Sequence, residues 1–233
     1  RESRAAGVQW NLSPVVDVNN NPLNPIINTR SFSERPEIVS EFALRYIKGL
    51  QDFGMISTAK HFPGHGDTQT DSHSSLAMIP SDSSRLWSIE LKPFIDVAKA
   101  GVDAVMIAHV HAPDFQPEAD RPATLSDFWV TDILRNQIGY NGTIITDGMG
   151  MGGVTKNYSD DFALVETVKA GCDIIIQNHD IVGSIDAIEE AVLNGEISLD
   201  RINSSALKML KMKEKVGLHL NPYVNIESMM NHI

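Results

Sequence analysis

The densest group of chemically active side chains lies in one polar stretch, residues 60–73, which reads KHFPGHGDTQTDSH. Its histidines, aspartates and lysine are His61, His65, His73, Asp67, Asp71 and Lys60. An imidazole can give and take a proton near neutral pH, and a neighbouring carboxylate orients and polarises it. Asp71 and His73 therefore form a candidate general acid/base pair. The same residue types also suit a divalent metal, or a polar loop held by histidine hydrogen bonds, and spacing alone leaves these alternatives open.

A second candidate site is the segment GTIITDGMGMGGV, residues 142–154, where an apolar run ends in Asp147 and a glycine-rich turn follows. A carboxylate at the carboxyl end of a barrel strand faces the central pocket. The glycines allow a tight turn and a close approach of a ligand to the backbone. The alternative is that Asp147 caps the following turn through its own side chain. Met151 could pack beneath an apolar face of a ligand, or fill core space.

Polar residues close two other apolar runs. Asp17 ends the run SPVVD, and Arg30 follows the Asn/Pro stretch at residues 19–25, whose composition is that of a turn. Both side chains could bind polar groups of a ligand. His109 and His111 end a further run and point the same way, because side chains alternate with period two along a strand. One of them could line a pocket, although a hydrogen-bonded core histidine is the plainer interpretation of either.

Buried strands must position these residues, and the sequence supplies apolar runs that alternate with amphipathic stretches. The predicted strands are Asn11–Val18, Ser57–Phe62, Ala104–Val110, Thr143–Thr146 and Asp173–Gln177. The predicted helices are Pro36–Phe53, Leu91–Ala100, Asp127–Ile138, Asp161–Ala170, Ser184–Asn194 and Asp200–Val216. This alternation predicts a parallel α/β fold. An open sheet and a (β/α)8 barrel both fit. The absence of a glycine-rich phosphate fingerprint after the first strand disfavours a nucleotide-binding sheet, and the polar residues after the strand ends favour the barrel.

Smaller signals support the same elements. Glycine falls just after five predicted helices, where a left-handed residue ends a helix: Gly54, Gly101, Gly139, Gly171 and Gly195. Ser33 is a possible cap for the first helix. Cys172, the single cysteine, sits in an apolar run, so we expect a buried thiol and no intrachain disulfide.

Composition excludes some classes of partner. The 233 residues suffice for one domain, and a net charge of −11 argues against a nucleic acid or an anionic membrane surface. No apolar run has the length of a membrane span. The opening RESRAAG reads as the tail of a helix already under way. We therefore expect a soluble protein with a segment removed upstream, and its compartment, cytoplasmic, periplasmic or secreted, stays open.

The stretch at residues 60–73 resembles the signature of glycoside hydrolase family 3, specifically its β-N-acetylglucosaminidase branch. The segments NLSPVVDVNNNPLNPIINTRSF, AVMIAHV, GTIITDGMGMGGV and AGCDIIIQ resemble that family's fourth, sixth, seventh and eighth barrel strands. The resemblance implies a TIM-type (β/α)8 barrel without its first three strands. Residues 1–218 would form the last five βα units, and residues 219–233 a tail or linker to a further domain. Because open sheet edges favour aggregation, we expect this segment to be well ordered only alongside the absent strands.

The resemblance also implies roles. Asp147 is the expected nucleophile of a retaining β-N-acetylhexosaminidase, and His73 paired with Asp71 is the expected acid/base. The resemblance implies that Lys60, His61 and Arg30 contact the sugar hydroxyls and the N-acetyl group. The strand-end patterns described above add Asp17, His109 and Met151 as candidate substrate-binding residues. The expected substrate is a small cell-wall or chitin-type saccharide, with no cofactor and no metal. Gly148 departs from the family's frequent polar residue after the nucleophile, which bears on substrate range.

Three other interpretations stay open. A metal-dependent hydrolase could use the His/Asp loop, and chelation would then abolish its activity. A phosphorylase would keep the same site and use phosphate in place of water. A non-catalytic saccharide-binding relative is disfavoured, because a decayed site would be free to lose Asp147, Asp71 or His73.

Overall fold

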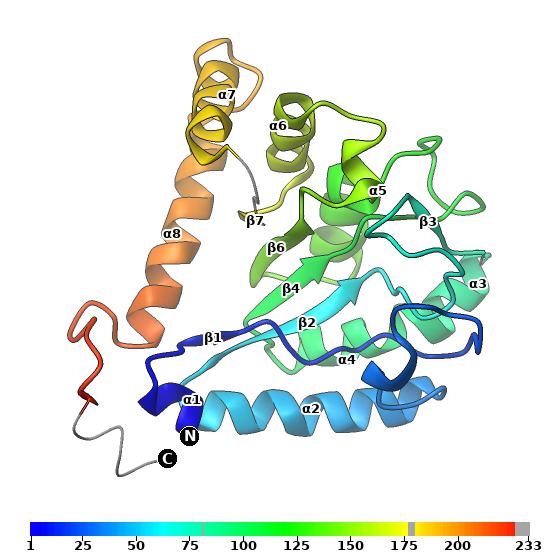
Figure 1. Ribbon diagram of the computed structural model, residues 1–233, viewed down its shortest axis with the longest axis horizontal. Helices are drawn as coiled ribbons and strands as arrows, with labels where there is room; N and C mark the ends of the chain where they lie inside the picture. The colour runs from blue at the N-terminus through cyan, green and yellow to red at the C-terminus, as the bar shows by residue number, and fades with distance from the viewer. Residues whose placement is uncertain (81, 177–179, 227–233) are drawn as a thin grey trace.

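The computed structural model describes residues 1–80, 82–176 and 180–226 (Figure 1). Five strands form one parallel sheet in the order β1-β2-β4-β6-β7, curled into part of a barrel wall. Their bounds are β1 (Trp10–Asn11), β2 (Ile56–Phe62), β4 (Ala104–Ile107), β6 (Thr143–Gly148) and β7 (Ile174–Ile176). The prediction of a parallel α/β fold is confirmed. The predicted end of the last strand, Gln177, lies outside the described residues.

Helices connect successive strands and pack on one another along the outside of the sheet (Figure 1). The α-helices are α1 (Glu2–Ala5), α2 (Pro36–Asp52), α3 (Ser83–Arg85), α4 (Lys92–Lys99), α5 (Gly152–Thr155), α6 (Asp160–Ala170), α7 (Ile181–Leu193) and α8 (Leu199–Lys215). Two segments are 3-10 helices, η1 (Asn28–Arg30) and η3 (Ala123–Leu125), and two are π-helices, η2 (Leu86–Glu90) and η4 (Phe128–Gln137). None of these helices is long and apolar enough to cross a lipid bilayer.

Two predicted strands differ from the observed ones. The run Asn11–Val18 forms only the short β1, because Pro14 has no N–H to donate to a ladder. The segment still runs alongside β2, since the Val16 N–H donates to the Lys60 carbonyl at 2.6 Å. The predicted strand Ala104–Val110 ends at Ile107. Its last residue, Val110, begins β5 (Val110–His111), which leaves the main sheet and pairs with β3 (Ala77–Met78).

Helix ends and types show further differences. The predicted helix Asp127–Ile138 is the π-helical η4, in which the Ile138 N–H donates to the carbonyl five residues earlier. Ser33 is not the helix cap, because Arg35 occupies that position and the Ser33 hydroxyl accepts the Arg35 N–H at 3.1 Å. The five glycines predicted to end helices all have positive φ, between 68° and 120°. Cys172 is buried, as expected.

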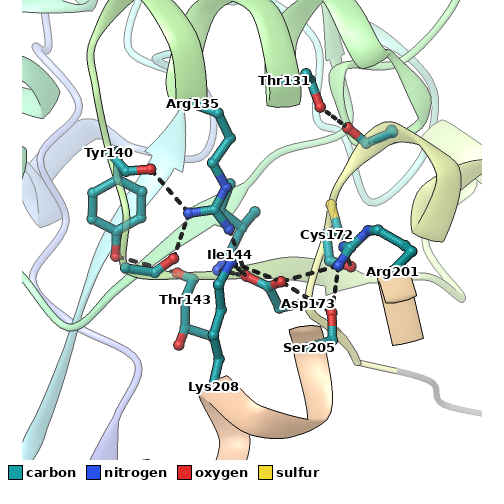
Figure 2. Close-up of polar contacts among 12 residues, drawn as sticks. Thr131, Arg135, Tyr140, Thr143, Ile144, Cys172, Asp173, Arg201, Ser205 and Lys208 are labelled. Carbon is teal, nitrogen blue, oxygen red and sulfur yellow. Dashed lines mark hydrogen bonds and ion pairs between the residues drawn. The ribbon is translucent and has the colours of Figure 1, made fainter. Parts of the chain in front are cut away.

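At the amino-terminal end of the sheet, one buried carboxylate joins two helices and a strand (Figure 2). Asp173 lies just before β7, and its side chain has no exposed surface. Its carboxylate pairs with Arg135 of η4 at 2.6 Å, and with Arg201 and Lys208 of α8 at 3.3 and 2.9 Å. It also accepts the backbone N–H of Ile144 in β6 at 2.9 Å. Asp173 therefore holds α8 and η4 against the sheet.

Asp103, just before β4, repeats this arrangement. It accepts the Ser57 N–H of β2 at 2.9 Å and pairs with Lys215 of α8. The two lysines of α8 that form these pairs, Lys208 and Lys215, are seven residues apart, which is a rise of about 10.5 Å along a helix. The strands they reach, β7 and β4, lie two positions apart in the sheet, or about 9.6 Å. The lysine spacing thus matches the strand spacing. As α8 crosses the end of the sheet, Lys208 meets Asp173 before β7 and Lys215 meets Asp103 before β4.

We expect these carboxylates to make the fold sensitive to acid. Burial raises the pKa of Asp103, but hydrogen bonds from Lys215 and Ser57 outweigh it and hold the pKa below the ordinary 3.8. A carboxyl with a lowered folded pKa stabilises the fold above its unfolded pKa, and that stability is lost as pH falls through the folded pKa. Urea unfolding of wild type and Asp103→Asn should therefore differ most at neutral pH. The difference should shrink below about pH 4, and a constant difference would contradict this account.

Candidate active site

An exposed histidine–aspartate pair stands on the loop that follows β2. The His73 ring lies with Nδ1 2.7 Å from Oδ1 of Asp71, and the same oxygen accepts the His73 backbone N–H at 2.8 Å. The His73 side chain is 64% exposed, so its ring can meet a ligand. Burial raises the pKa of Asp71, but the two hydrogen bonds from His73 outweigh it and lower the pKa overall. Asp71 therefore stays ionised and orients the imidazole.

Ser72, the residue between Asp71 and His73, anchors the loop on its buried side. Ser72 is buried, and its hydroxyl lies 2.9 Å from Nε2 of His65. Burial lowers the pKa of His65 to about 4, which keeps its ring neutral. The His65 backbone N–H in turn donates to Oδ1 of Asp17 at 2.7 Å. A buried chain of contacts therefore connects Asp17 to the loop that carries His73.

The same loop docks on the glycine-rich segment that follows Asp147. The Gly152 N–H donates to the His73 carbonyl at 2.9 Å, and the Gly153 N–H donates to the Ser72 carbonyl at 3.0 Å. A Cβ on Gly152 would lie 2.5 Å from the Ser74 carbonyl oxygen, a distance that real Cβ atoms do not adopt. These glycines were expected to admit a ligand to the backbone. In the structure they admit the protein's own His73 loop.

We expect Gly152→Ala to displace the His73 loop and to lower kcat. The added methyl must push the Ser74 backbone away, and a misplacement of about 1 Å at a catalytic group can cost roughly 100-fold in rate. The matched control is Gly49→Ala in α2, where an added Cβ meets nothing within 4 Å. Steady-state turnover of both variants measures the effect. Equal kcat for both would show that the docking of the loop is immaterial.

Asp147 is the penultimate residue of β6, so the strand runs two residues beyond its predicted end. The side chain is half-buried, and its Oδ1 accepts the N–H of Gly148 at 2.8 Å. The carboxylate thus bonds to the backbone of the next residue, which still belongs to β6. Electrostatic interactions link Asp147 to Lys60, His65 and His109. Asp147 therefore lies among the basic residues at the carboxyl ends of β2 and β4.

His109 supports the strand end and has no exposed surface. Its Nε2 lies 2.9 Å from the Gly148 carbonyl oxygen, and its Nδ1 lies 2.6 Å from the Thr124 hydroxyl. Burial lowers the pKa of His109, against an opposing effect of Asp147. A neutral ring must donate from Nε2, because a carbonyl oxygen can only accept. In this structure His109 holds the backbone beside Asp147 instead of facing an open pocket.

Lys60 and His61 occupy the end of β2, above a buried carboxylate. Asp17 is fully buried, with Oδ2 2.7 Å from Nδ1 of His61. Burial raises the pKa of Asp17, but the charge and hydrogen bond of His61 outweigh it, so the pKa is lowered. Asp17 therefore orients His61 and has no surface to offer a ligand. Lys60 is half-buried, and burial lowers its pKa despite the opposing charge of Asp147.

Two other predicted site residues lie at the margin. Arg30 ends η1 with an exposed side chain, and its Nε donates to the Ile26 carbonyl at 2.9 Å. An electrostatic interaction with Lys60 places its guanidinium near the site. Met151 is 9% exposed and lies just before α5.

Sequence reasoning missed the residues that hold the loop in place. Asn24, in the stretch interpreted only as a turn, is buried and donates to the carbonyls of His65 at 2.7 Å and Gly66 at 3.0 Å. A Cβ on Gly66 would lie 1.8 Å from the Val18 carbonyl oxygen. Asn24 also makes the predicted turn, because its Oδ1 accepts the N–H of Ile26 at 2.9 Å and of Ile27 at 2.7 Å, and its contacts to the loop come in addition. No periodicity marks such a contact, because its partners lie about forty residues away.

Two histidines of residues 60–73 are paired with aspartates, and Asp67 of the same stretch is paired with a cation. Asp17 contacts His61, Asp71 contacts His73, and Asp67 pairs with Arg85 at 2.5 Å. Among residues 1–80, 82–176 and 180–226, no three His, Cys, Asp or Glu side chains gather as metal ligands do. The arrangement can supply a carboxylate, a proton-transferring imidazole and cationic or neutral hydrogen-bond donors.

Comparison with known proteins adds an independent line of support. A sequence profile described as the glycosyl hydrolase family 3 N terminal domain matches residues 1–212. Beta-hexosaminidase A of Pseudoalteromonas piscicida is 34% identical over 235 residues, covering 93% of this chain and 39% of that protein. A glycoside hydrolase family 3 beta-N-acetylglucosaminidase from Paenibacillus sp. superposes with a TM-score of 0.91 at 39% identity, covering 96% of this chain and 43% of that one.

A beta-glucoside phosphorylase also superposes, with a TM-score of 0.94 at 27% identity, covering 100% of this chain and 43% of that one. The chain thus spans about 40% of the length of each of these relatives. The match to the family profile nevertheless extends over nearly the whole chain. The chain belongs to glycosyl hydrolase family 3, and the part of the family that it matches is the N-terminal domain.

Proposed function

We propose that this chain carries the catalytic residues of a retaining β-N-acetylhexosaminidase that releases terminal N-acetylglucosamine. The observation that carries the proposal is the exposed His73–Asp71 pair, fastened by Ser72 and His73 to the backbone that follows Asp147. A proton donor and a carboxylate held beside each other are what glycosidic cleavage with retention requires. The beta-hexosaminidase and beta-N-acetylglucosaminidase names of two relatives support the choice of an N-acetyl sugar.

In the proposed first step, the Asp147 carboxylate attacks the anomeric carbon and forms a covalent glycosyl-enzyme. The bond from that carbon to the glycosidic oxygen breaks, and protonated His73 gives its Nε2 proton to the departing oxygen. In the second step, neutral His73 takes a proton from water, whose oxygen attacks the same carbon and frees Asp147. Asp71 keeps the ring oriented through Nδ1 in both steps. A cationic acid also avoids placing a second carboxylate beside the anionic nucleophile.

The neighbouring residues are proposed to hold the sugar. Lys60, His61 and Arg30 supply donors to its hydroxyls and N-acetyl oxygen, and Met151 supplies an apolar contact. Asp17 acts through His61, with which it shares a 2.7 Å contact. His109 acts through the Gly148 backbone.

We further propose that residues 1–218 form five βα units of a (β/α)8 barrel, completed by three more strands between β7 and β1. The supporting observation is the curled parallel sheet, which is open at these two strands. Residues 219–226 are mostly exposed, with Tyr223 83% exposed, which supports a tail or linker beyond residue 218. The proposed partners are a small saccharide and further domains of the same protein.

The test compares hydrolysis of an aryl β-N-acetylglucosaminide and an aryl β-glucoside by the full-length protein. We expect the wild type to prefer the N-acetyl sugar. We expect His73→Ala to lower kcat/KM by about 10² to 10⁴, the usual contribution of a general acid/base. The matched control is His219→Ala, because His219 is exposed and lies outside the site. Preference for the glucoside, or an unimpaired His73→Ala variant, would contradict the proposal.

A phosphorylase is the second candidate, since a beta-glucoside phosphorylase is among the similar structures. Phosphate would then replace water in the second step and yield a sugar 1-phosphate. Product analysis with and without phosphate separates the two reactions. Full activity after chelation would exclude the metal-dependent alternative. Binding of the saccharide without turnover would favour a non-catalytic relative.

A further inference from the structure

A pocket of about 440 Å³ opens beside the His73 loop, and none of the roles above uses it. Ser75, Leu76 and Met78 form one wall, residues 156–158 form another, and Asp120 adds a carboxylate. Its volume lies within the roughly 300–1,000 Å³ of small-molecule sites. Leu76, Met78 and Tyr158 give it apolar surface, while Asp120 and Lys156 give it an acceptor and a donor. This combination suits a sugar ring, which has apolar C–H faces and hydroxyls around its edge.

Both of these walls are formed by residues that the structure describes. The segments follow β2, β5 and β6 along the chain, away from β1 and β7 at the two open edges of the sheet. The segments after β2 and β6 are also bonded to each other, because Gly152 N–H donates to the His73 carbonyl. In Figure 1, β3 and α5 accordingly lie next to each other. Strands added between β7 and β1 would therefore not have to build this pocket.

The pocket adjoins the proposed acid/base. Ser75 lies two residues after His73. Lys156 lies four residues after Gly152, a rise of about 6 Å along a helix. On its other flank His73 interacts electrostatically with His109, whose Nε2 contacts the carbonyl next to Asp147. The His73 loop is thus bonded to the segment that follows Asp147, and two residues beyond His73 it forms a wall of the pocket.

We propose that this pocket receives the leaving-group sugar, a pyranose joined to N-acetylglucosamine through the oxygen that His73 protonates. The inference rests on the proposed function. Because His73 must reach the glycosidic oxygen, the sugar on the far side of that oxygen starts beside the His73 loop. Tyr158 is held for this role by stacking on Phe162 at 5.7 Å and by a hydrogen bond from its hydroxyl to the Asp120 carbonyl at 3.3 Å. Lys156 and Tyr158 are then specificity-determining residues.

The test uses two substrates of the full-length protein that differ only in the leaving group. One is the β-1,4-linked disaccharide of N-acetylglucosamine. The other is β-N-acetylglucosaminyl fluoride, whose single-atom leaving group does not reach the pocket. We expect Lys156→Ala and Tyr158→Ala to lower the ratio of kcat/KM for the disaccharide to kcat/KM for the fluoride by about tenfold or more. The control is Lys99→Ala, an exposed lysine of α4, which should leave the ratio unchanged.

The outcomes separate this inference from the function on which it rests. A wild type that cleaves both compounds, with variants whose ratio is unchanged, would overturn the pocket assignment and leave the proposed function standing. A wild type that cleaves neither compound would overturn both. A lowered ratio in Lys156→Ala that Lys99→Ala does not share would support the pocket, and exposed Lys156 can be replaced without disturbing the core.

Discussion

Replacement of Asp147 by Asn is expected to lower kcat for an aryl β-N-acetylglucosaminide by roughly 10⁴-fold or more, the scale reached when a covalent nucleophile is lost. Asn keeps the shape of the side chain and an oxygen that can accept the Gly148 N–H, now bonded at 2.8 Å. The amide is a poor nucleophile, so the loss reports chemistry and not folding. Turnover and thermal unfolding of the same samples measure both. The control is Asp114→Asn, because Asp114 is exposed and outside the site.

A second measurement identifies the attacking atom. Acid quenching of wild-type protein during turnover should leave one N-acetylhexosaminyl group on the peptide that contains Asp147. Asp147→Asn should leave none there. A label on another carboxylate, or full activity of Asp147→Asn, would assign the nucleophile elsewhere.

Asp173→Asn is expected to destabilise the fold by about 3 kcal/mol, the lower part of the range for breaking a buried ion pair. The substitution removes the charge that faces Arg135, Arg201 and Lys208, and leaves three cations close together. The lower part of this free-energy range applies because the three cationic side chains are 17–26% exposed and therefore stay partly hydrated. Urea unfolding at neutral pH measures the loss.

The matched control is Asp52→Asn, which breaks a pair with Lys48 one helical turn away on α2. These side chains are 74% and 54% exposed, so the change should cost less than about 1 kcal/mol. If both variants lost the same free energy, the cluster around Asp173 would contribute no more than a surface ion pair.

Periodicity predicted the order of strands and helices well, because burial on both faces of a parallel strand leaves a clear pattern. It failed where a local feature decided the hydrogen bonding. Pro14 shortened the first strand, and the π-helical turns of η4 bury the same face as an α-helix would, so apolar spacing cannot separate them. The proposed closure into a barrel needs strands that the five observed ones do not supply, so no pattern along these strands could predict it.

The candidate site was predictable to the level of residue types and strand ends. Asp71 and His73 are two residues apart, so their contact is local and visible in sequence. The supports are not local: Ser72 meets His65 through a folded loop, and its carbonyl meets Gly153 about eighty residues away. The same long range explains why Asp17 and His109, predicted to meet a ligand, are instead buried beneath His61 and Gly148.

The pairs formed by α8 also set an order of events during synthesis. Asp103 is separated from Lys215 by 112 residues, and Asp173 from Lys208 by 35. On the ribosome, strands β4 and β7 both emerge before α8, the helix whose cations neutralise the aspartates that precede them, and β4 emerges much earlier than β7. Nascent chains that stop before Leu199 should therefore keep the Arg135–Asp173 pair but lack the cations that α8 brings to Asp173 and Asp103. Stable packing at this end of the sheet is therefore expected only after α8 has left the exit tunnel.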